Sequence, residues 1–215
     1  MYYYCERIDS SFWSEPINAI TNIAFLSVAF IFFYNYRNIK LAQNCAYLIT
    51  FIGIGSFLFH TIPNKITGML DTLSIALLVM YYIYSINPYI FKMNKYFSIL
   101  IVVIFPILCF VFGSALKSSF VGYSAFYIPI LLYLILLSIM LWLKNNPIRK
   151  GMIIAGLVFT LSICMRILDF KVCHLVPYGT HFIWHILNSI TIYFAVKSLV
   201  QITLLNDRTS PKIPT

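Results

Sequence analysis

Seven long apolar stretches divide this chain, and each is long enough to cross a lipid bilayer as a helix. A membrane-spanning helix needs about 20 mostly apolar residues, because it rises 1.5 Å per residue through a hydrocarbon core of about 30 Å. The composition agrees, since 61% of the 215 residues are hydrophobic and only 10% are charged, against about 25% charged in soluble domains. The sequence therefore predicts an all-α polytopic membrane protein and excludes an ordinary water-soluble or disordered chain.

Proline and asparagine residues separate most of these stretches, as expected for turns and helix ends. The third span is expected to end at Asn87-Pro88, and Thr180 is a suitable N-cap for the last one. Acidic residues precede the first span, which predicts a retained helix instead of a cleaved signal peptide. We expect one membrane domain over residues 1–206 and a short polar tail over residues 207–215. The predicted spans cover residues 17–36, 41–62, 66–86, 96–116, 120–143, 148–168 and 181–205.

The loop cations predict an orientation and a class of partner. With seven spans, five of the 15 Lys and Arg residues lie on the side of the N-terminus and the other ten lie opposite. Basic residues concentrate on the cytoplasmic side, so we expect a cytoplasmic C-terminus and a non-cytoplasmic N-terminus. The net charge of +9 is spread over short loops, which fits anionic lipid headgroups and not nucleic acid. The five cations are Arg7, Lys65, Lys117, Arg166 and Lys171.

Ionisable side chains inside membrane spans are costly, so they mark candidate functional sites. His60 lies late in the second span, Asp71 early in the third, and His181 and His185 open the last. Ser56 shares a helix face with His60, four residues on, and the two other histidines share one in the same way. By helix rise, His60 lies within about 3 Å of the outer end of its span, Asp71 roughly 8 Å in, and the His pair about 0–6 Å in. All five side chains are therefore predicted near the same, non-cytoplasmic membrane face.

These residue types at one depth match the needs of a catalytic zinc site. Three neutral imidazoles and a water give zinc four ligands and leave one position exchangeable. Zinc lowers the pKa of its water and polarises a carbonyl. Asp71 is placed to orient or deprotonate the water, and Ser56 to donate to an oxyanion. The alternative reading is that the histidines are hydrogen-bonded packing residues.

Three segments of the chain resemble the alkaline ceramidase family, within the CREST superfamily of seven-span hydrolases and receptors. Residues 55–60 read GSFLFH and precede Asp71 by eleven residues, which matches the family's Ser-x-x-x-His…Asp element. Residues 181–185 read HFIWH and match its His-x-x-x-His block, with the tryptophan before the second histidine. Residues 5–7 and 12–22 read CER and FWSEPINAITN, which is similar to the opening segment of bacterial members.

The resemblance implies an intramembrane amidase that hydrolyses ceramide to a sphingoid base and a fatty acid. His60, His181 and His185 would then bind zinc, while Asp71 serves the water and Ser56 stabilises the oxyanion. A lipid amide is best hydrolysed near headgroup depth, where its two tails can stay in hydrocarbon. The expected partners are therefore the bilayer and a ceramide-like lipid. The short chain, without an obvious retention signal, indicates a bacterial inner membrane, with the site near its non-cytoplasmic face; a eukaryotic endomembrane is the alternative.

The resemblance also implies a calcium site near the N-terminus. The match is incomplete at Tyr3 and Ile8, where the animal enzymes have Asp and Asn. Calcium takes six to eight oxygen ligands, so water or further carbonyls would have to complete the shell. The alternative is a solvated acidic segment with a helix-capping glutamate. The ligands implied here are Glu6, Glu15, the main-chain carbonyl of Tyr4 and, as a substitute, Asp9.

Two further pairs of residues carry expectations. The family has a disulfide bridge, and the resemblance implies that Cys5 and Cys173, both predicted on the oxidising side, form it here. Arg166 and Asp169 are three residues apart near the outer end of the sixth span, which predicts an ion pair within the helix.

Other functions remain open at the level of sequence. One is a lipid receptor similar to the progestin and adipoQ receptors, which a large soluble N-terminal region and an inverted orientation would favour. Another is a bis-histidine haem carrier, in which His60 faces His181 or His185. A third keeps the zinc but hydrolyses a different lipid amide or ester.

Overall fold

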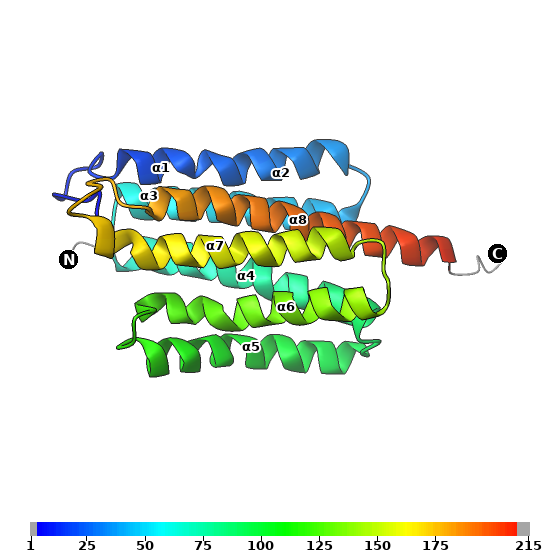
Figure 1. Ribbon diagram of the computed structural model, residues 1–215. Coiled ribbons are helices and arrows are strands. Elements are labelled where there is room, and N and C mark those ends of the chain that lie inside the picture. Colours follow the sequence, from blue (N-terminus) through cyan, green and yellow to red (C-terminus); the bar gives the residue numbers. More distant parts are fainter. Residues whose placement is uncertain (1–3, 210–215) are drawn as a thin grey trace.

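The computed structural model describes residues 4–209, with side chains through residue 206, as an all-α bundle (Figure 1). Within this part of the chain, seven helices are long and apolar enough to cross a membrane, which confirms the predicted architecture. The first span combines α1 (Pro16–Thr21) with α2 (Ile23–Asn35), and the fifth combines η1 (Gly122–Tyr127) with α6 (Ile128–Leu143). The remaining helices are α3 (Lys40–Thr61), α4 (Lys65–Ile90), α5 (Lys95–Leu116), α7 (Arg149–Val172) and α8 (His181–Thr209).

The last helix, α8, holds the bundle together. It packs against α1, α2, α3, α4 and α7, whereas α5 contacts α4, α6 and η1 at the margin (Figure 1). Phe32, Ile49, Met152 and Leu199 are fully buried in the apolar core. The N-terminal segment and the loops before α4 and α8 lie at one end of the bundle, and the C-terminus lies at the other (Figure 1). The first turns of α8 therefore lie at the same end of the bundle as the N-terminal segment, and its last turns lie at the opposite end (Figure 1).

The start of α4 is fixed by a capping box. The Asn64 side chain accepts hydrogen bonds from the backbone N–H groups of Ile66 and Thr67 at 2.8 and 3.0 Å. In return, the Thr67 hydroxyl accepts from the Asn64 N–H at 3.0 Å. Such caps stabilise a helix by about 1 kcal/mol. This cap sets the position of Asp71, one turn further along α4.

Three helices are longer than the sequence predicts. α4 continues past Asn87-Pro88 to Ile90 with the proline inside it, although proline cannot donate a hydrogen bond to the carbonyl of Tyr84. The Asn87 side chain accepts from the hydroxyl of Tyr133, which anchors this last turn to α6. α7 runs on to Val172 instead of ending near residue 168. α8 extends to Thr209, into the predicted tail, and residues 210–215 lie outside the described part of the chain.

Candidate metal centre

Three histidines from α3 and α8 meet at the end of the bundle that also holds the N-terminal segment. The imidazole centroids of His60 and His181 are 5.2 Å apart, those of His60 and His185 4.9 Å, and those of His181 and His185 4.7 Å. One ligand nitrogen from each ring lies within 4.8 Å of the other two. All three side chains are buried. Within residues 4–206 this is the one cluster of His, Cys, Asp or Glu that could hold a metal ion.

Hydrogen bonds orient two of the rings and leave their other nitrogen free. The Nδ1 of His60 bonds the Glu15 carboxylate at 2.5 Å, so its Nε2 is the available atom. The Thr21 hydroxyl donates to the carbonyl of Ile17 at 2.8 Å and so accepts from Nδ1 of His185 at 3.0 Å. This assignment leaves Nε2 of His185 as a lone-pair donor.

The free nitrogens point to a missing partner. Nε2 of His60 and Nδ1 of His181 are buried without a hydrogen-bond partner in the described structure. A buried polar atom without a partner costs about 1–3 kcal/mol. Neutral imidazole nitrogens are the ligands that zinc prefers. The cluster therefore fits a zinc ion, because binding would satisfy the atoms that the protein leaves unpaired.

Glu15 connects the histidine cluster to the N-terminal segment. Its carboxylate contacts His60, the Arg7 guanidinium and the Asn18 side-chain amide, the last at 3.1 Å. Burial raises the pKa of Glu15, but hydrogen bonds from His60, Arg7 and Asn18 lower it below its usual value. Glu15 is therefore an anionic acceptor for the imidazole N–H. A carboxylate in this position fixes the ring orientation and raises the basicity of the ligand.

Asp169 fixes the start of α8 and therefore the position of His181. One carboxylate oxygen accepts from the backbone N–H groups of Thr180 and His181 at 2.7 and 2.9 Å, and the other accepts from Cys5 N–H at 3.1 Å. The predicted ion pair between Arg166 and Asp169 is therefore wrong. The backbone N–H groups at the junction of the preceding loop and α8 donate hydrogen bonds to the Asp169 carboxylate, in the place of the expected guanidinium.

Arg166 turns towards aromatic rings instead. Its guanidinium lies 5.3 Å from the centroid of the Tyr127 ring and 5.6 Å from that of the Trp184 ring. Trp184 is buried and stacks beside His181. Cation–π contacts of this kind stabilise by about 1–2 kcal/mol when shielded from water. Arg166 therefore belongs to the wall of the site and not to an intrahelical ion pair.

A disulfide joins the N-terminal segment to the end of α7. Cys5 and Cys173 are bonded, with their Cα atoms 5.4 Å apart, and 168 positions separate them in the sequence. Gly179 makes room for this junction, because its φ is +63° and an added Cβ would collide with the Asp169 carboxylate. The structure thus brings together the pair that the sequence resemblance implied.

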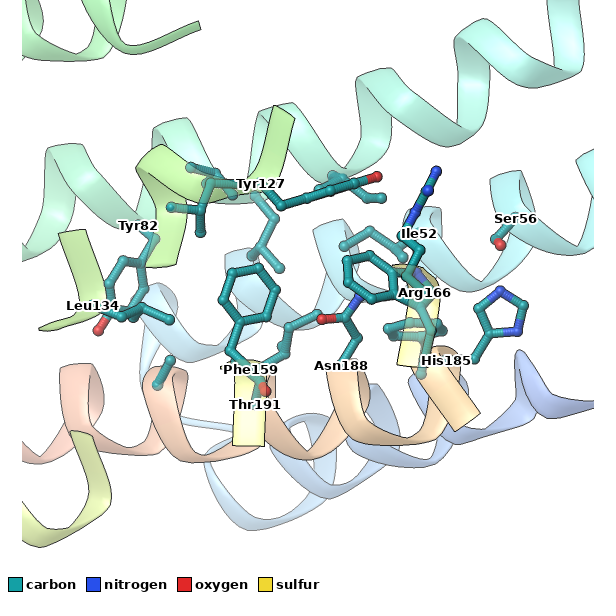
Figure 2. A pocket seen from close by; sticks show the side chains of 18 of the residues that line it. Ile52, Ser56, Tyr82, Tyr127, Leu134, Phe159, Arg166, His185, Asn188 and Thr191 are labelled. Atoms are coloured by element: carbon teal, nitrogen blue, oxygen red, sulfur yellow. The ribbon is translucent and has the colours of Figure 1, made fainter. Parts of the chain in front are cut away.

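Ser56 and Asp71 line a cavity whose wall also includes His181 and His185, and Figure 2 shows Ser56 and His185 at the same end of it. Gly55 allows this arrangement, since an added Cβ would lie 3.2 Å from the Leu70 carbonyl oxygen and 3.4 Å from the Asp71 nitrogen. The close approach of α3 and α4 at this point places the hydroxyl and the carboxylate on facing helices. The cavity wall at this end is also formed by Tyr4, whose ring stacks on His181 at 3.7 Å.

The cavity continues from the polar end deep into the bundle. In Figure 2, Ser56 and His185 lie at one end, and Tyr82 and Leu134 lie at the other. From His181 to Val196, both in its wall, α8 rises roughly 22 Å at 1.5 Å per residue. Its inner lining is largely apolar: Ile75, Leu78, Val79, Ile83, Ile130, Leu134, Phe159, Ile192 and Val196.

The residues implied as calcium ligands accept hydrogen bonds from other groups of the protein. Both carboxylate oxygens of Glu6 accept backbone N–H groups, from Ile17 at 2.7 Å and Asn18 at 2.9 Å. Asp9 is exposed, and its carboxylate accepts from the backbone and hydroxyl of Ser11. The Tyr4 carbonyl accepts from Arg7 N–H, and Glu15 is engaged as described above. Tyr3 lies outside the described residues. Because both oxygens of Glu6 and of Glu15 already accept from protein donors, the implied ligands do not fit a calcium ion, which takes six to eight oxygens.

Several contributing residues are not predicted by local sequence patterns. The resemblance implies that Glu15 and Tyr4 are calcium ligands, whereas in the structure Glu15 contacts His60 and Tyr4 contacts His181. Thr21 and Asp169 were given no role at the histidines. One signal was available, since polar residues recur through the otherwise apolar first turns of the opening span, FWSEPINAITN. Polar side chains kept inside a span indicate buried partners.

Comparison with known proteins places this geometry in a family. Residues 3–213 match the model of the family described as Ceramidase, which covers nearly the whole chain. A search of curated proteins returns no match to the sequence. A seven-helix bundle with buried histidines at one end, together with a family match of this extent, leads to one conclusion: the chain belongs to the Ceramidase family.

Proposed function

We propose that this protein is a zinc-dependent amidase that hydrolyses ceramide within the membrane. Family membership supports ceramide as the substrate class and amide hydrolysis as the reaction. The observation that carries the zinc proposal is the cluster of three buried histidines, two of which present nitrogens without a partner. The cluster opens onto an apolar cavity, which suits a substrate with long hydrocarbon chains.

The surrounding residues supply the remaining chemistry. A zinc ion held by His60, His181 and His185 would acidify a water molecule and polarise the amide carbonyl. Asp71 accepts the proton of the attacking water and returns it to the nitrogen of the leaving sphingoid base, as a general base and then acid. Ser56 donates a hydrogen bond to the carbonyl oxygen as negative charge develops there. The amide C–N bond breaks, and water contributes its OH group to the fatty acid and its other hydrogen to the nitrogen of the amine.

The cavity provides the place for a hydrocarbon chain. Its polar end holds the reacting groups, and its apolar lining extends inward beside α4, α6 and α8. A chain that enters the cavity from the bilayer leaves surroundings as apolar as the cavity lining, so the cavity orients the substrate through packing contacts along the chain. We propose that this chain is the acyl group, because the amide carbonyl must lie at the polar end.

Metal analysis combined with substrate hydrolysis tests the proposal. We expect about one zinc per purified chain and release of fatty acid from a series of ceramides. Removal of the zinc should abolish release, and added zinc should restore it. Full turnover without zinc would contradict the mechanism, and an optical spectrum with haem bands would favour a haem carrier. Hydrolysis of lipid esters but not of ceramide would favour another lipid hydrolase.

Replacement of Ser56 by alanine should lower kcat about 100-fold, because loss of one oxyanion donor costs 10²–10³ in rate. Zinc content should not change, since Ser56 is not in the histidine cluster. The measurement is ceramide turnover per bound zinc. Ser27→Ala on the exposed face of α2 is the matched control. An unchanged rate in Ser56→Ala would show that the metal alone stabilises the oxyanion.

A further inference from the structure

The N-terminal segment places a buried cation beside the histidine cluster. Arg7 is only 4% exposed, and its Nε bonds the Glu15 carboxylate. One terminal nitrogen donates to the backbone carbonyl of His60 at 2.7 Å, and the other to that of Asp9 at 3.2 Å. The nitrogen that bonds Asp9 also donates to the Ser11 carbonyl at 3.5 Å. A single guanidinium therefore contacts a carboxylate and three main-chain oxygens from different parts of the chain.

These are the kinds of oxygen that a divalent cation would bind. Glu6, Asp9 and Glu15, here called the N-terminal acidic cluster, were expected to supply calcium ligands, yet the guanidinium already lies against Glu15. Arg carries a permanent charge and directs its donors in a rigid planar fork. It can join a carboxylate to carbonyls without the six to eight oxygens that calcium requires.

The contact reaches the proposed zinc ligand through Glu15. The other oxygen of the Glu15 carboxylate bonds Nδ1 of His60, while Arg7 itself bonds the His60 carbonyl. Arg7 therefore fixes both the acceptor of the imidazole and the backbone that carries it. Without this cation, Glu15 would be a buried carboxylate with weaker compensation, free to turn away from the ring.

Building on the proposed function, we propose that the Arg7 guanidinium is a permanent internal cation that takes the place of calcium at the N-terminal acidic cluster and positions Glu15 against His60. Arg7 is thus a positioning residue: it acts on zinc binding and turnover through Glu15 and does not touch the substrate. Catalysis by this chain is therefore independent of calcium.

The first test uses the intact, zinc-loaded protein and calcium alone as the probe. Ceramide turnover is measured in buffer freed of calcium by a chelating resin, because a soluble chelator would also withdraw zinc, and again after calcium is added. We expect the two rates to agree within twofold. Equilibrium dialysis with radioactive calcium should show no saturable binding up to about 1 mM, the weak end of protein calcium sites. One bound calcium per chain, or a fivefold rise in rate, would overturn the proposal.

The second test changes Arg7 itself. Arg7→Gln should lower kcat about 10- to 100-fold per zinc-loaded molecule and leave KM unchanged, as is typical when a residue behind a metal ligand is lost. Arg37→Gln, at an exposed arginine between α2 and α3, should match the wild type. Arg7→Lys keeps the charge but not the fork, so its rate should fall between those of the wild type and Arg7→Gln.

Chemical rescue separates positioning from folding. Arg7→Ala should regain part of its kcat when methylguanidinium is added, and Arg37→Ala should not respond. A purely structural role predicts lower yield and melting temperature with an unchanged kcat per zinc-loaded molecule, and that result would refute the proposal. If the wild type binds zinc but does not hydrolyse ceramide, the proposed function fails. Calcium binding and the zinc affinity of Arg7→Gln still decide the role of Arg7, because neither uses the substrate.

Discussion

Replacing any one of His60, His181 and His185 with alanine will remove both bound zinc and ceramide hydrolysis. A catalytic zinc site needs three protein ligands, and each of these variants keeps only two of the imidazoles. Turnover should fall to the background of the assay, because both the activated water and the polarisation of the carbonyl are lost. The measurement is metal content by mass spectrometry beside fatty acid release from ceramide.

The loop before α8 offers a matched control for these variants. His174 is exposed in this loop and lies outside the histidine cluster, so His174→Ala should retain zinc and full turnover. The His60 variant also removes the partner of the buried Glu15 carboxylate, so it should lower the melting temperature as well. A triple alanine variant that folds, lacks zinc and still hydrolyses ceramide at the wild-type rate would end the metal hypothesis.

The second large effect is expected at Asp71. Asp71→Asn preserves the shape of the side chain but replaces an acceptor oxygen with an NH₂ donor and cannot accept a proton. We expect kcat to drop by about 10²–10⁴-fold, the usual range for general acid–base catalysis. Zinc content should match the wild type, because Asp71 does not belong to the cluster of ligand nitrogens. Turnover per bound zinc is therefore the quantity to measure.

The next residue on α4 provides the comparison for Asp71. Thr72 is exposed on the outer side of the same helix, and Thr72→Ala should leave turnover unchanged. An Asp71→Asn variant with wild-type kcat would assign Asp71 a supporting role in the cavity wall. Loss of zinc in this variant would instead show that the carboxylate helps to hold the metal.

Hydropathy was sufficient to predict the bundle because lipid leaves few alternatives for the backbone. Within hydrocarbon every N–H and C=O group must be paired inside its own helix, so span number and approximate length follow from the apolar stretches. The residues at which the helices end were predicted less accurately than the number of spans. The turn after Pro88 persists because Asn87 is held by Tyr133, 46 residues away, a contact that no local pattern predicts.

The meeting of the three histidines was predictable from the sequence, but the residues that hold their rings in place were not. The spacing of His181 and His185 and the depth of His60 are regular properties of helices. The bond between Glu15 and His60 joins residues 45 positions apart, and it depends on how the N-terminal segment folds over α3. The ion pair expected for Arg166 failed for the same reason, since local spacing was overridden by a loop that supplies N–H groups to Asp169.

The disulfide between Cys5 and Cys173 joins a segment that is synthesised early to one that is synthesised late. The two cysteines are 168 positions apart, and the second lies just before the final helix. His60 is inserted early, but His181 and His185 arrive only with α8. A nascent chain that lacks its last helix therefore has both cysteines but only one of the three imidazoles. Lipid-cleaving capacity should thus arise in a single late event, after the ribosome has delivered the whole polypeptide, and interrupted translation products should be inert towards the surrounding membrane.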